Sequence, residues 1–365
     1  MQLLAALSLL IWLYLCFAHG RFWSSTPELP AALPLEFPAV DIVVPARDEA
    51  ATIAPVIASL LAQNYAGATR VILVDDGSAD GTAALAGSAP NLLILLAAPK
   101  PREWSGKLWA LAQGIAASSA PLLLFTDADI VHAPEHLAAL VARAMQPRVD
   151  MVSEMVRLNC ASLAERALVP AFVYFFQMLY PFARVNAPRS RAAAAAGGTV
   201  LIRREALERV GGIAAIKHAL IDDVSLAKAV KAQGPIFLGH SGLAVSIRAY
   251  PAVADVWRMI SRTAFTQLRY SGLILALTLA GLALVWLVPV GSMLFARGWT
   301  ALAGLAAFLL AAVSYLPTLR RYGRSPLWAA ALPAIALFYM SATLSSALNH
   351  WFGRGASWKN RAYGA

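Results

Sequence analysis

The 365-residue chain has few cysteines and few charged side chains. Two cysteines, Cys16 and Cys160, exclude a disulfide scaffold and a four-cysteine metal site. Charged residues make up 14% of the chain and hydrophobic residues 59%, whereas a soluble globular protein has about 25% charged residues. These proportions exclude a disordered chain and do not fit a purely soluble enzyme.

Acidic residues are absent after Asp255. Residues 1–255 hold 20 Lys and Arg against 20 Asp and Glu, so the net charge of +10 belongs to the 10 basic residues of 256–365. Because those basic residues flank long apolar runs, they indicate a membrane region that faces anionic lipid. We therefore expect a phospholipid bilayer as a partner, and no nucleic acid.

Four apolar runs without a charged residue are candidates for membrane helices: residues 3–18, 271–296, 299–319 and 326–347. Arg21 follows the first run instead of preceding it, which favours an uncleaved anchor with its N-terminus outside over a signal peptide. A fifth run, residues 167–183, contains Pro170 and Pro181, which favours a helix in the membrane interface over a spanning one.

The number of crossings stays open. The cluster of Arg320, Arg321 and Arg324 and the basic tail both suit the cytoplasmic side, yet one apolar run lies between them. Either that run, which contains Pro333, is re-entrant, or the tail lies outside. The expected organisation is an anchor over 1–22, a catalytic domain over 38–250, an interfacial segment over 251–270, a transmembrane region over 271–352 and a basic cytoplasmic tail over 353–365.

Strand-like and helix-like stretches alternate in the middle of the chain. The predicted strands cover residues 40–44, 70–74, 91–96 and 122–125, and the predicted helices cover 52–61, 82–86 and 107–117. This alternation predicts an α/β fold with a parallel sheet covered by helices. Ligands of such sheets bind beyond the carboxyl ends of the strands.

Acidic residues follow three of these strands. The first strand runs into residues 45–49 (Pro-Ala-Arg-Asp-Glu), the second into Asp75 and Asp76, and the fourth into Asp127 and Asp129. Asp80 is typical of a turn or helix cap. Three acidic strand ends at one edge of a sheet repel one another unless a cation is present. A divalent metal that carries a diphosphate fits, because it prefers oxygen ligands.

The motifs resemble those of glycosyltransferase family 2 in content and order. They are Pro45 to Glu49, Asp75 to Asp80 (Asp-Asp-Gly-Ser-Ala-Asp), Gly106-Lys107, Thr126-Asp-Ala-Asp129, Gly197-Gly198-Thr199 and Asp222-Asp223-Val-Ser-Leu226. Residues 103–110 and 263–270 resemble the hopene-associated subgroup, whose members are bacterial, membrane-bound and linked to hopanoid lipid synthesis. The resemblance covers about residues 39–270 and implies an inverting enzyme. The implied fold is an α/β GT-A nucleotide-sugar-binding domain with a Rossmann-like sheet, plus transmembrane helices.

The resemblance also implies roles for individual residues. Asp223 is the expected base that deprotonates the acceptor, and Asp222 stands where the family usually has Glu, which leaves open which of the two acts. A helix N-terminus fits the same pair, since residues 224–233 are typical of a helix. A Mg²⁺ or Mn²⁺ ion is expected at Asp127 and Asp129. The implied donor site consists of Pro45, Ala46, Glu49, Asp75, Asp76, Lys107 and Asp127.

Weaker motifs suggest contacts with the acceptor or diphosphate. Gly197, Gly198 and Thr199 fit either a turn before a strand at 200–202 or a backbone that approaches the acceptor. Arg269 and Tyr270 resemble the Arg-Trp of a family element, although Thr266 departs from it; a juxtamembrane arginine is the alternative. Residues 358–361 (Trp-Lys-Asn-Arg) resemble a tail motif of related membrane glycosyltransferases. The alternative is that these residues simply bind the lipid surface.

Two histidines match a zinc-protease pattern, His132-x-x-Glu135-His136. Zinc binding by two histidines four residues apart needs an intact helical turn, and Pro134 would leave His132 outside it. We therefore expect surface capping here and no zinc.

The sequence thus predicts a membrane-bound inverting glycosyltransferase that moves a sugar from a nucleotide-sugar to a membrane lipid. The donor is expected to be UDP-linked, and the subgroup resemblance implies a role in hopanoid synthesis. It predicts a multi-pass protein of the bacterial inner membrane with a cytoplasmic catalytic domain. Transfer to polyprenyl phosphate is one alternative, and a catalytically silent membrane scaffold or export component is another. Intact carboxylates at all three strand ends argue against a catalytically silent protein.

Overall fold

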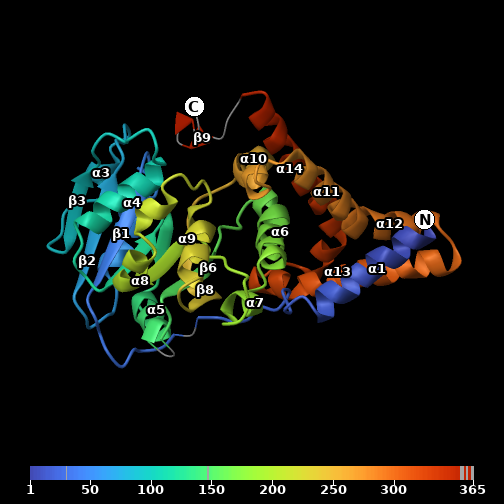
Figure 1. Cartoon of the computed structure of the whole chain (residues 1–365), viewed down its shortest axis with the longest axis horizontal. Helices are drawn as coiled ribbons and strands as arrows, with labels where there is room; N and C mark the ends of the chain where they lie inside the picture. Colours follow the sequence, from blue (N-terminus) through green and yellow to red (C-terminus); the bar gives the residue numbers. More distant parts are fainter. Residues whose placement is uncertain (30, 146–147, 354–356, 359–360, 363–365) are drawn as a thin grey trace. The chain divides into compact units, whose positions relative to one another are not determined.

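The computed structural model describes all residues except 30, 146–147, 354–356, 359–360 and 363–365. The chain forms two units (Figure 1). A sheet unit comprises Thr26–Asn159 and Arg184–Arg248, and a helical unit comprises Met1–Ser25, Cys160–Ala183 and Ala249–Ala365. Cys160–Ala183 thus groups with the helical unit, although it lies inside the stretch predicted to be the catalytic domain. The predicted tail motif at 358–361 lies outside the residues whose side chains are described.

The sheet unit contains an eight-stranded sheet in the order β3-β2-β1-β4-β7-β6-β8-β5. Its strands are β1 (Val40–Ala46), β2 (Thr69–Asp75), β3 (Leu92–Leu96), β4 (Leu122–Thr126), β5 (Ile130–His132), β6 (Met151–Arg157), β7 (Thr199–Arg203) and β8 (Ile236–Ser246). The predicted parallel arrangement is confirmed for β1 to β4.

The sheet as a whole is mixed, so the predicted parallel arrangement holds only for its β3-β2-β1-β4 half. β7 runs antiparallel to both β4 and β6, β8 is parallel to β6, and β5 is antiparallel to β8. Only residues 127–129 separate β4 from β5, too few for the crossover that a parallel neighbour requires. Neighbouring strands in the mixed half of the sheet, such as β4 and β7 or β5 and β8, come from segments that lie far apart in the chain.

Helices cover both faces of the sheet (Figure 1). Ile42 and Val44 of β1 share a core with side chains of α2 (Ile53–Leu61) and α5 (His136–Met145). Val43 points to the other face, where a Cβ added to Gly114 of α4 (Gly106–Ala116) would lie only 2.3 Å from its Cγ1. The strand sequences are largely continuous apolar runs because both faces of the sheet are buried. The remaining helices are α3 (Thr82–Leu85), α7 (Phe182–Asn186), α8 (Arg204–Arg209), η1 (Ile213–Ile216) and α9 (Asp222–Lys231).

Among the described residues of the helical unit, three helices are long and apolar enough to cross a membrane: Gly272–Phe295, Gly298–Arg321 and Pro326–Trp351. They match the three predicted C-terminal runs, and Pro333 lies in the first turn of α14, where a proline does not interrupt a helix. Crossing itself stays a prediction. The elements are α1 (Gln2–Phe17), α6 (Leu163–Leu179), α10 (Val253–Gln267), α11 (Gly272–Leu282), η2 (Ala283–Leu287), α12 (Val288–Phe295), α13 (Gly298–Arg321), η3 (Pro326–Ala331) and α14 (Leu332–Trp351).

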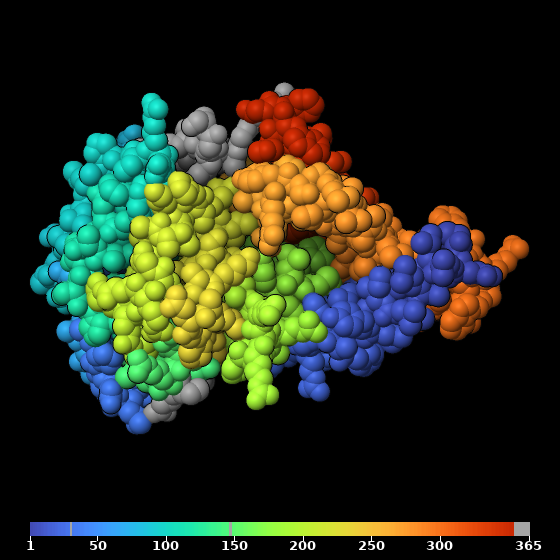
Figure 2. Space-filling model, in the orientation of Figure 1, coloured from blue at the N-terminus to red at the C-terminus, as the bar shows by residue number. Residues whose placement is uncertain are grey.

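The N-terminal helix α1 lies along α13, as Figure 2 shows for the blue and orange segments of this unit. Trp12 of α1 is fully buried and stacks edge-on against Trp286, with ring centroids 4.9 Å apart. Its indole Nε1 donates to the Val285 carbonyl over 2.9 Å, within the π-helical segment η2. The first predicted apolar run is therefore a packed helix of this unit.

Candidate active site

The three acidic motifs follow the ends of β2, β1 and β4, which are adjacent strands in the parallel half of the sheet. Ala46 at the end of β1 is in register with Asp75 at the end of β2. β4 lies on the other side of β1 and ends at Thr126, directly before Asp127. The carboxyl ends of parallel strands meet at one edge of the sheet, so Asp75 and Asp127 belong to the same edge.

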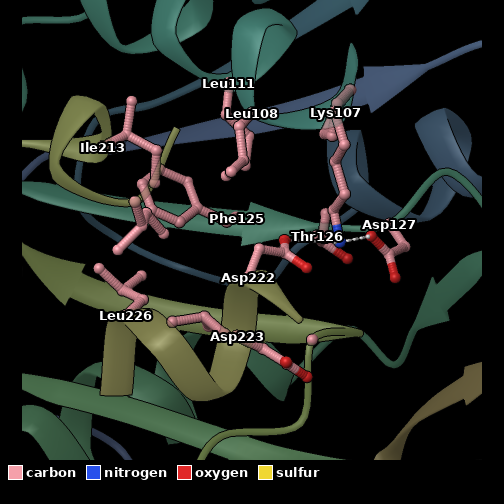
Figure 3. Close-up of a pocket in the computed structure, with 14 residues that line it drawn as sticks. Lys107, Leu108, Leu111, Phe125, Thr126, Asp127, Ile213, Asp222, Asp223 and Leu226 are labelled. Atoms are coloured by element: carbon pink, nitrogen blue, oxygen red, sulfur yellow. Dashed lines mark ion pairs between the residues drawn. The ribbon is translucent and has the colours of Figure 1, made fainter. Parts of the chain in front are cut away.

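A pocket opens at this edge, and Figure 3 shows its two halves. One half is polar, with Lys107 at the start of α4, Asp127 after β4, and Asp222 and Asp223 at the start of α9. Lys107 Nζ lies 2.8 Å from Asp127 Oδ1 and 3.3 Å from Asp222 Oδ2. The other half is apolar and was not foreseen from the sequence; its side chains are Leu108, Leu111, Phe125, Ile213 and Leu226.

The pKa values of Lys107, Asp127 and Asp223 in the polar half are all raised, but for different reasons. Burial lowers the pKa of Lys107, but the negative charges of Asp127 and Asp222 outweigh it and hold the pKa above its usual range. Burial, and then the charge of Asp222, raise the pKa of Asp223 to about 7. Burial also raises the pKa of Asp127, with Lys107 opposing it. Lys107 is therefore a fixed cation, whereas Asp223 can exchange a proton near neutral pH.

Asp222 and Asp223 are the first two residues of α9, which confirms the helix N-terminus predicted for them. The Asp223 Oδ1 atom accepts a hydrogen bond from the Val224 N–H over 2.7 Å. A Cβ placed on Gly197 would lie 3.1 Å from Asp223 Oδ2. Gly197 and Gly198 form a turn before β7. Gly197 approaches Asp223, whereas a Cβ on Gly198 would meet Val156 and Ile130, and contact with an acceptor stays a prediction.

The predicted nucleotide side is organised around the loops after β1 and β2. Asp75 Oδ1 accepts hydrogen bonds from Ser78 N–H over 2.8 Å and Ser78 Oγ over 2.6 Å. Asp76 is buried and lies 3.8 Å from the guanidinium of Arg47. Asp80 accepts from Thr82 N–H over 3.1 Å, as an aspartate in a turn does, and Gly81 is the N-cap of α3. Of the predicted donor residues, Pro45, Lys107 and Asp127 line the pocket. Ala46 and Asp75, the last residues of β1 and β2, and Glu49 and Asp76, in the loops that follow, are not among its lining residues.

Arg248 is a site residue that the sequence analysis missed. Its Nε donates to Asp129 Oδ2 over 2.7 Å, and its Nη2 donates to Glu49 Oε1 over 2.6 Å. Burial lowers its pKa, but the charges of Asp129 and Glu49 raise it above the usual range. Arg248 stands 119 and 199 positions from these partners, and no local pattern could have indicated the pairing.

The arginine bears on the predicted metal site. Asp127 faces the pocket with a partly exposed carboxylate, whereas Asp129 is buried against Arg248 and Ser246 through Oδ2. Within the described part of the chain, no group of three His, Cys, Asp or Glu side chains is arranged to hold a metal. Asp127 Oδ1 pairs with Lys107 over 2.8 Å, so a divalent cation at Asp127 and Asp129 stays a prediction.

The remaining predicted residues fall in both units. Thr199 pairs with Thr126 across β7 and β4. Arg269 and Tyr270 lie in the helical unit after α10, with φ angles of 53° and 56°. The Tyr270 ring stacks on His350 at a centroid distance of 4.5 Å, and its hydroxyl accepts from Thr266 Oγ1 over 3.0 Å. Tyr270 is thus packed within its own unit.

The expectation of surface capping at the two histidines is wrong. His132 and His136 are 4% and 0% exposed, because a buried carboxylate of β6, Glu154, pairs with His136. A zinc role was not expected.

The family model of glycosyl transferase family 2 matches residues 41–211. An N-acetylglucosaminyltransferase of Bradyrhizobium sp. (strain ANU 289) is 31% identical over 130 residues, covering 33% of this chain and 82% of that relative. One of Bradyrhizobium elkanii is 35% identical over 118 residues, or 31% of this chain and 63% of the relative. The succinoglycan biosynthesis protein ExoU of Rhizobium meliloti is 34% identical, covering 38% of each chain.

The chain therefore belongs to glycosyltransferase family 2, and the prediction of a glycosyltransferase is confirmed at the level of the family. It spans less than two thirds of the length of several of these relatives, 63% of that from Bradyrhizobium elkanii and 38% of ExoU. A solved mannosyltransferase from Pyrobaculum calidifontis, in complex with GDP-mannose and Mn²⁺, covers 96% of this chain and 99% of its own, with a TM-score of 0.57 and 21% identity. That likeness supports a GT-A-like fold.

Proposed function

We propose that this chain transfers a sugar, with inversion, from a nucleotide-sugar donor to a lipid acceptor. The observation that carries the proposal is the polar half of the pocket, where one lysine and three carboxylates meet at the carboxyl edge of the sheet. A fixed cation beside carboxylates suits a substrate that carries a diphosphate leaving group and an acceptor that must lose a proton.

Asp223 is the proposed base. A carboxylate with a pKa near 7 is well matched to accept the proton of an acceptor hydroxyl at neutral pH. Asp222 raises that pKa by its own charge while it is paired with Lys107. Lys107 is the proposed contact for the donor phosphates, because its charge is fixed and its ammonium faces the pocket.

A divalent cation, Mg²⁺ or Mn²⁺, is part of the proposal. Asp127 is its proposed protein ligand, with phosphate oxygens and water completing the shell. When bound, the ion supplies charge neutralisation for the departing diphosphate. Asp129 would join as a second ligand after exchanging its contact with Arg248.

The acceptor and location rest on the helical unit. Three helices long enough to span a bilayer and a C-terminal region without acidic residues favour a multi-pass protein of the bacterial inner membrane. With the cluster of Arg320, Arg321 and Arg324 in the cytoplasm, crossings by Gly272–Phe295 and Gly298–Arg321 would leave the sheet unit on the same side. The names of the relatives favour N-acetylglucosamine as the sugar and hence a UDP-linked donor. The subgroup resemblance favours a hopanoid acceptor.

The test is turnover by the full-length protein in nanodiscs of bacterial lipid. The protein would be incubated with Mn²⁺ and with UDP-N-acetylglucosamine, UDP-glucose or GDP-mannose, and nucleoside diphosphate release and glycolipid products would be measured by mass spectrometry. We expect one UDP-sugar to be consumed only when a hydroxylated hopanoid is present. A product formed only with polyprenyl phosphate would mean that this lipid, and not a hopanoid, is the acceptor. No consumption of any donor, together with no nucleotide binding, would point to a silent scaffold and overturn the proposal.

A further inference from the structure

A chain of buried polar side chains lies beside the pocket and is not explained by donor or acceptor binding. His132, in β5, and His136, the first residue of α5, face each other with 2.8 Å between their Nδ1 atoms. The Nε2 atom of His136 makes a short contact with Glu154 Oε1 in β6. Glu154 is 0% exposed, so this carboxylate is withdrawn from water completely.

The other end of the chain reaches the pocket. His132 Nε2 lies 3.0 Å from Thr126 Oγ1, and Thr126 lines the pocket. Thr126 Oγ1 in turn donates to the Gly198 carbonyl over 3.0 Å. The same carbonyl accepts the N–H of Asp127 over 3.2 Å. The chain of four side chains, which come from three strands and a helix, thus ends at the Gly198 peptide group.

The Gly198 carbonyl fixes the direction of the hydrogen bonds from Thr126 to His136. A carbonyl oxygen only accepts, so the single Thr126 hydroxyl proton points to Gly198 and Thr126 Oγ1 must accept from His132 Nε2–H. A neutral His132 then has Nδ1 as an acceptor, and His136 Nδ1–H donates to it. One further proton lies between His136 Nε2 and Glu154. Burial, reinforced by His136, holds the pKa of His132 well below its usual range and keeps that ring neutral.

The turn that receives this chain is held from its other side as well. Ser153 Oγ, next to Glu154 in β6, donates to the Ala196 carbonyl over 3.0 Å and accepts from the Ala196 N–H over 2.8 Å. Gly197 lies between these two anchor points, and its α-carbon faces Asp223 so closely that an added Cβ would lie 3.1 Å from Oδ2. The backbone that limits the position of Asp223 is therefore fixed at both Ala196 and Gly198.

We infer that Glu154, His136, His132 and Thr126 are positioning residues that hold the Gly197–Gly198 turn against Asp223 and Asp127. The inference rests on the proposed function, because it gives Asp223 and Asp127 their roles. Replacing buried paired charges by apolar side chains of similar volume is often neutral or stabilising, so stability alone does not account for a four-residue polar chain. Its geometry ends at the turn, and a misplacement of about 1 Å at a reacting group can cost about 100-fold in rate.

The test is a double-mutant cycle on turnover in nanodiscs. His132→Phe and Thr126→Val each interrupt the chain at one link. We expect each to lower kcat by about 10- to 100-fold, as outer partners of functional groups do, and to change donor Kd, measured by calorimetry, by a smaller factor than kcat. Because both variants break one chain, the double variant should lose no more than the worse single variant. Losses that multiply would mean independent roles and would overturn the inference.

Glu154 provides a matched conservative variant. In the described part of the chain Glu154 Oε2 has no hydrogen-bond partner, so Glu154→Gln can place its amide N–H toward His136 Nε2 and keep every other bond direction. We expect Glu154→Gln to retain kcat within about threefold of the wild type. The kcat of Glu154→Leu should fall by about as much as that of His132→Phe. Wild-type kcat in a folded Glu154→Leu would overturn the inference.

A readout without turnover separates this inference from the proposed function. In wild-type protein with ¹⁵N-labelled histidine, NMR should find the proton of His132 on Nε2 and a proton of His136 on Nδ1. Finding His132 protonated on Nδ1 would overturn the positioning chain even in an active enzyme. An inactive wild type with the expected tautomers would overturn only the proposed function. The tautomers also decide the matter if the variants do not fold.

Discussion

Arg248 binds Asp129 and Glu49 at once, so the second aspartate of the Asp-Ala-Asp motif is held by an arginine in the structure. If a divalent cation recruits Asp129, it must compete with this arginine. Arg248→Met leaves two buried carboxylates without their cation, which should lower the free energy of unfolding by about 1–3 kcal/mol. We expect Mn²⁺ to raise the Tm of Arg248→Met by more than it raises the Tm of the wild type, measured in detergent with a saturating nucleoside diphosphate.

Arg70 offers a matched control for this experiment. It pairs with the buried carboxylate of Asp41 through Nε and Nη2, away from the pocket. Arg70→Met should also lower Tm, but Mn²⁺ should raise it no more than in the wild type. An equal response of Arg248→Met and Arg70→Met to Mn²⁺ would show that Asp129 does not take part in metal binding.

Lys107 is the cation of the polar half of the pocket, and Lys107→Met should weaken binding of the donor. Without its ammonium, Asp127, Asp222 and Asp223 would face a bound diphosphate with no fixed positive charge from this site. We expect UDP affinity, measured by calorimetry in the presence of Mn²⁺, to fall by about tenfold or more, which corresponds to about 1.4 kcal/mol. Lys217→Met is the control, because Lys217 pairs with the exposed Glu103 and does not line the pocket. Unchanged UDP affinity in Lys107→Met would remove Lys107 from the donor site.

The part of this site that local sequence could predict is the part built from local segments. β1, β2 and β4 are short apolar runs, so their boundaries and the acidic residues at their ends could be read from the sequence alone. Asp222 and Asp223 could be recognised as a helix start, but only the family resemblance suggested that they meet Lys107. Their encounter depends on the fold of the mixed half of the sheet, where β7 reverses direction beside β4.

The part that could not be predicted depends on pairs distant in sequence. Nothing near Arg248 indicates that it neutralises Asp129 and Glu49. The sequence predicts surface capping at His132 and His136, because Pro134 disfavours a zinc site there. Their burial is possible because Glu154 in β6 and Thr126 in β4 satisfy their ring nitrogens, and both partners come from other strands.

Gly197 allows the close approach of the turn to Asp223, and Gly197→Ala should disturb it. The new Cβ would lie 3.1 Å from Asp223 Oδ2, so either the turn or the carboxylate must shift by a few tenths of an ångström. We expect kcat to fall by about tenfold or more while donor Kd changes little, since small displacements of a reacting group are costly. Gly242→Ala is the control, because its Cβ would meet nothing within 4 Å. Equal kcat values for the two variants would mean that the turn does not restrict Asp223.

Asp223 should govern the pH dependence of the reaction. Its pKa of about 7 belongs to the enzyme without substrate, so kcat/KM should fall about tenfold per pH unit below that value, where the base becomes protonated. Asp223→Asn should lower kcat by about 10²–10⁴-fold and abolish this acidic limb. Asp222→Asn removes a negative charge that raises the pKa of Asp223, so the limb should move to lower pH. A limb that stays in place in Asp222→Asn would contradict the assignment.

The same pKa predicts a change in stability with a definite sign. The pKa of Asp223 is raised in the folded protein above its unfolded value, so the folded state binds more protons between those two values, and its stability falls as pH rises through them. At pH 8 the wild type carries the cost of an ionised, poorly solvated Asp223, which Asp223→Asn removes. At pH 4 Asp223 is protonated in the wild type, and the advantage of asparagine should be lost. We therefore expect Asp223→Asn to have a higher Tm than the wild type at pH 8 and an equal Tm at pH 4. A variant less stable than the wild type at pH 8 would mean that the carboxylate chiefly caps α9 through Val224 N–H, and that its ionised form is stabilised by the fold.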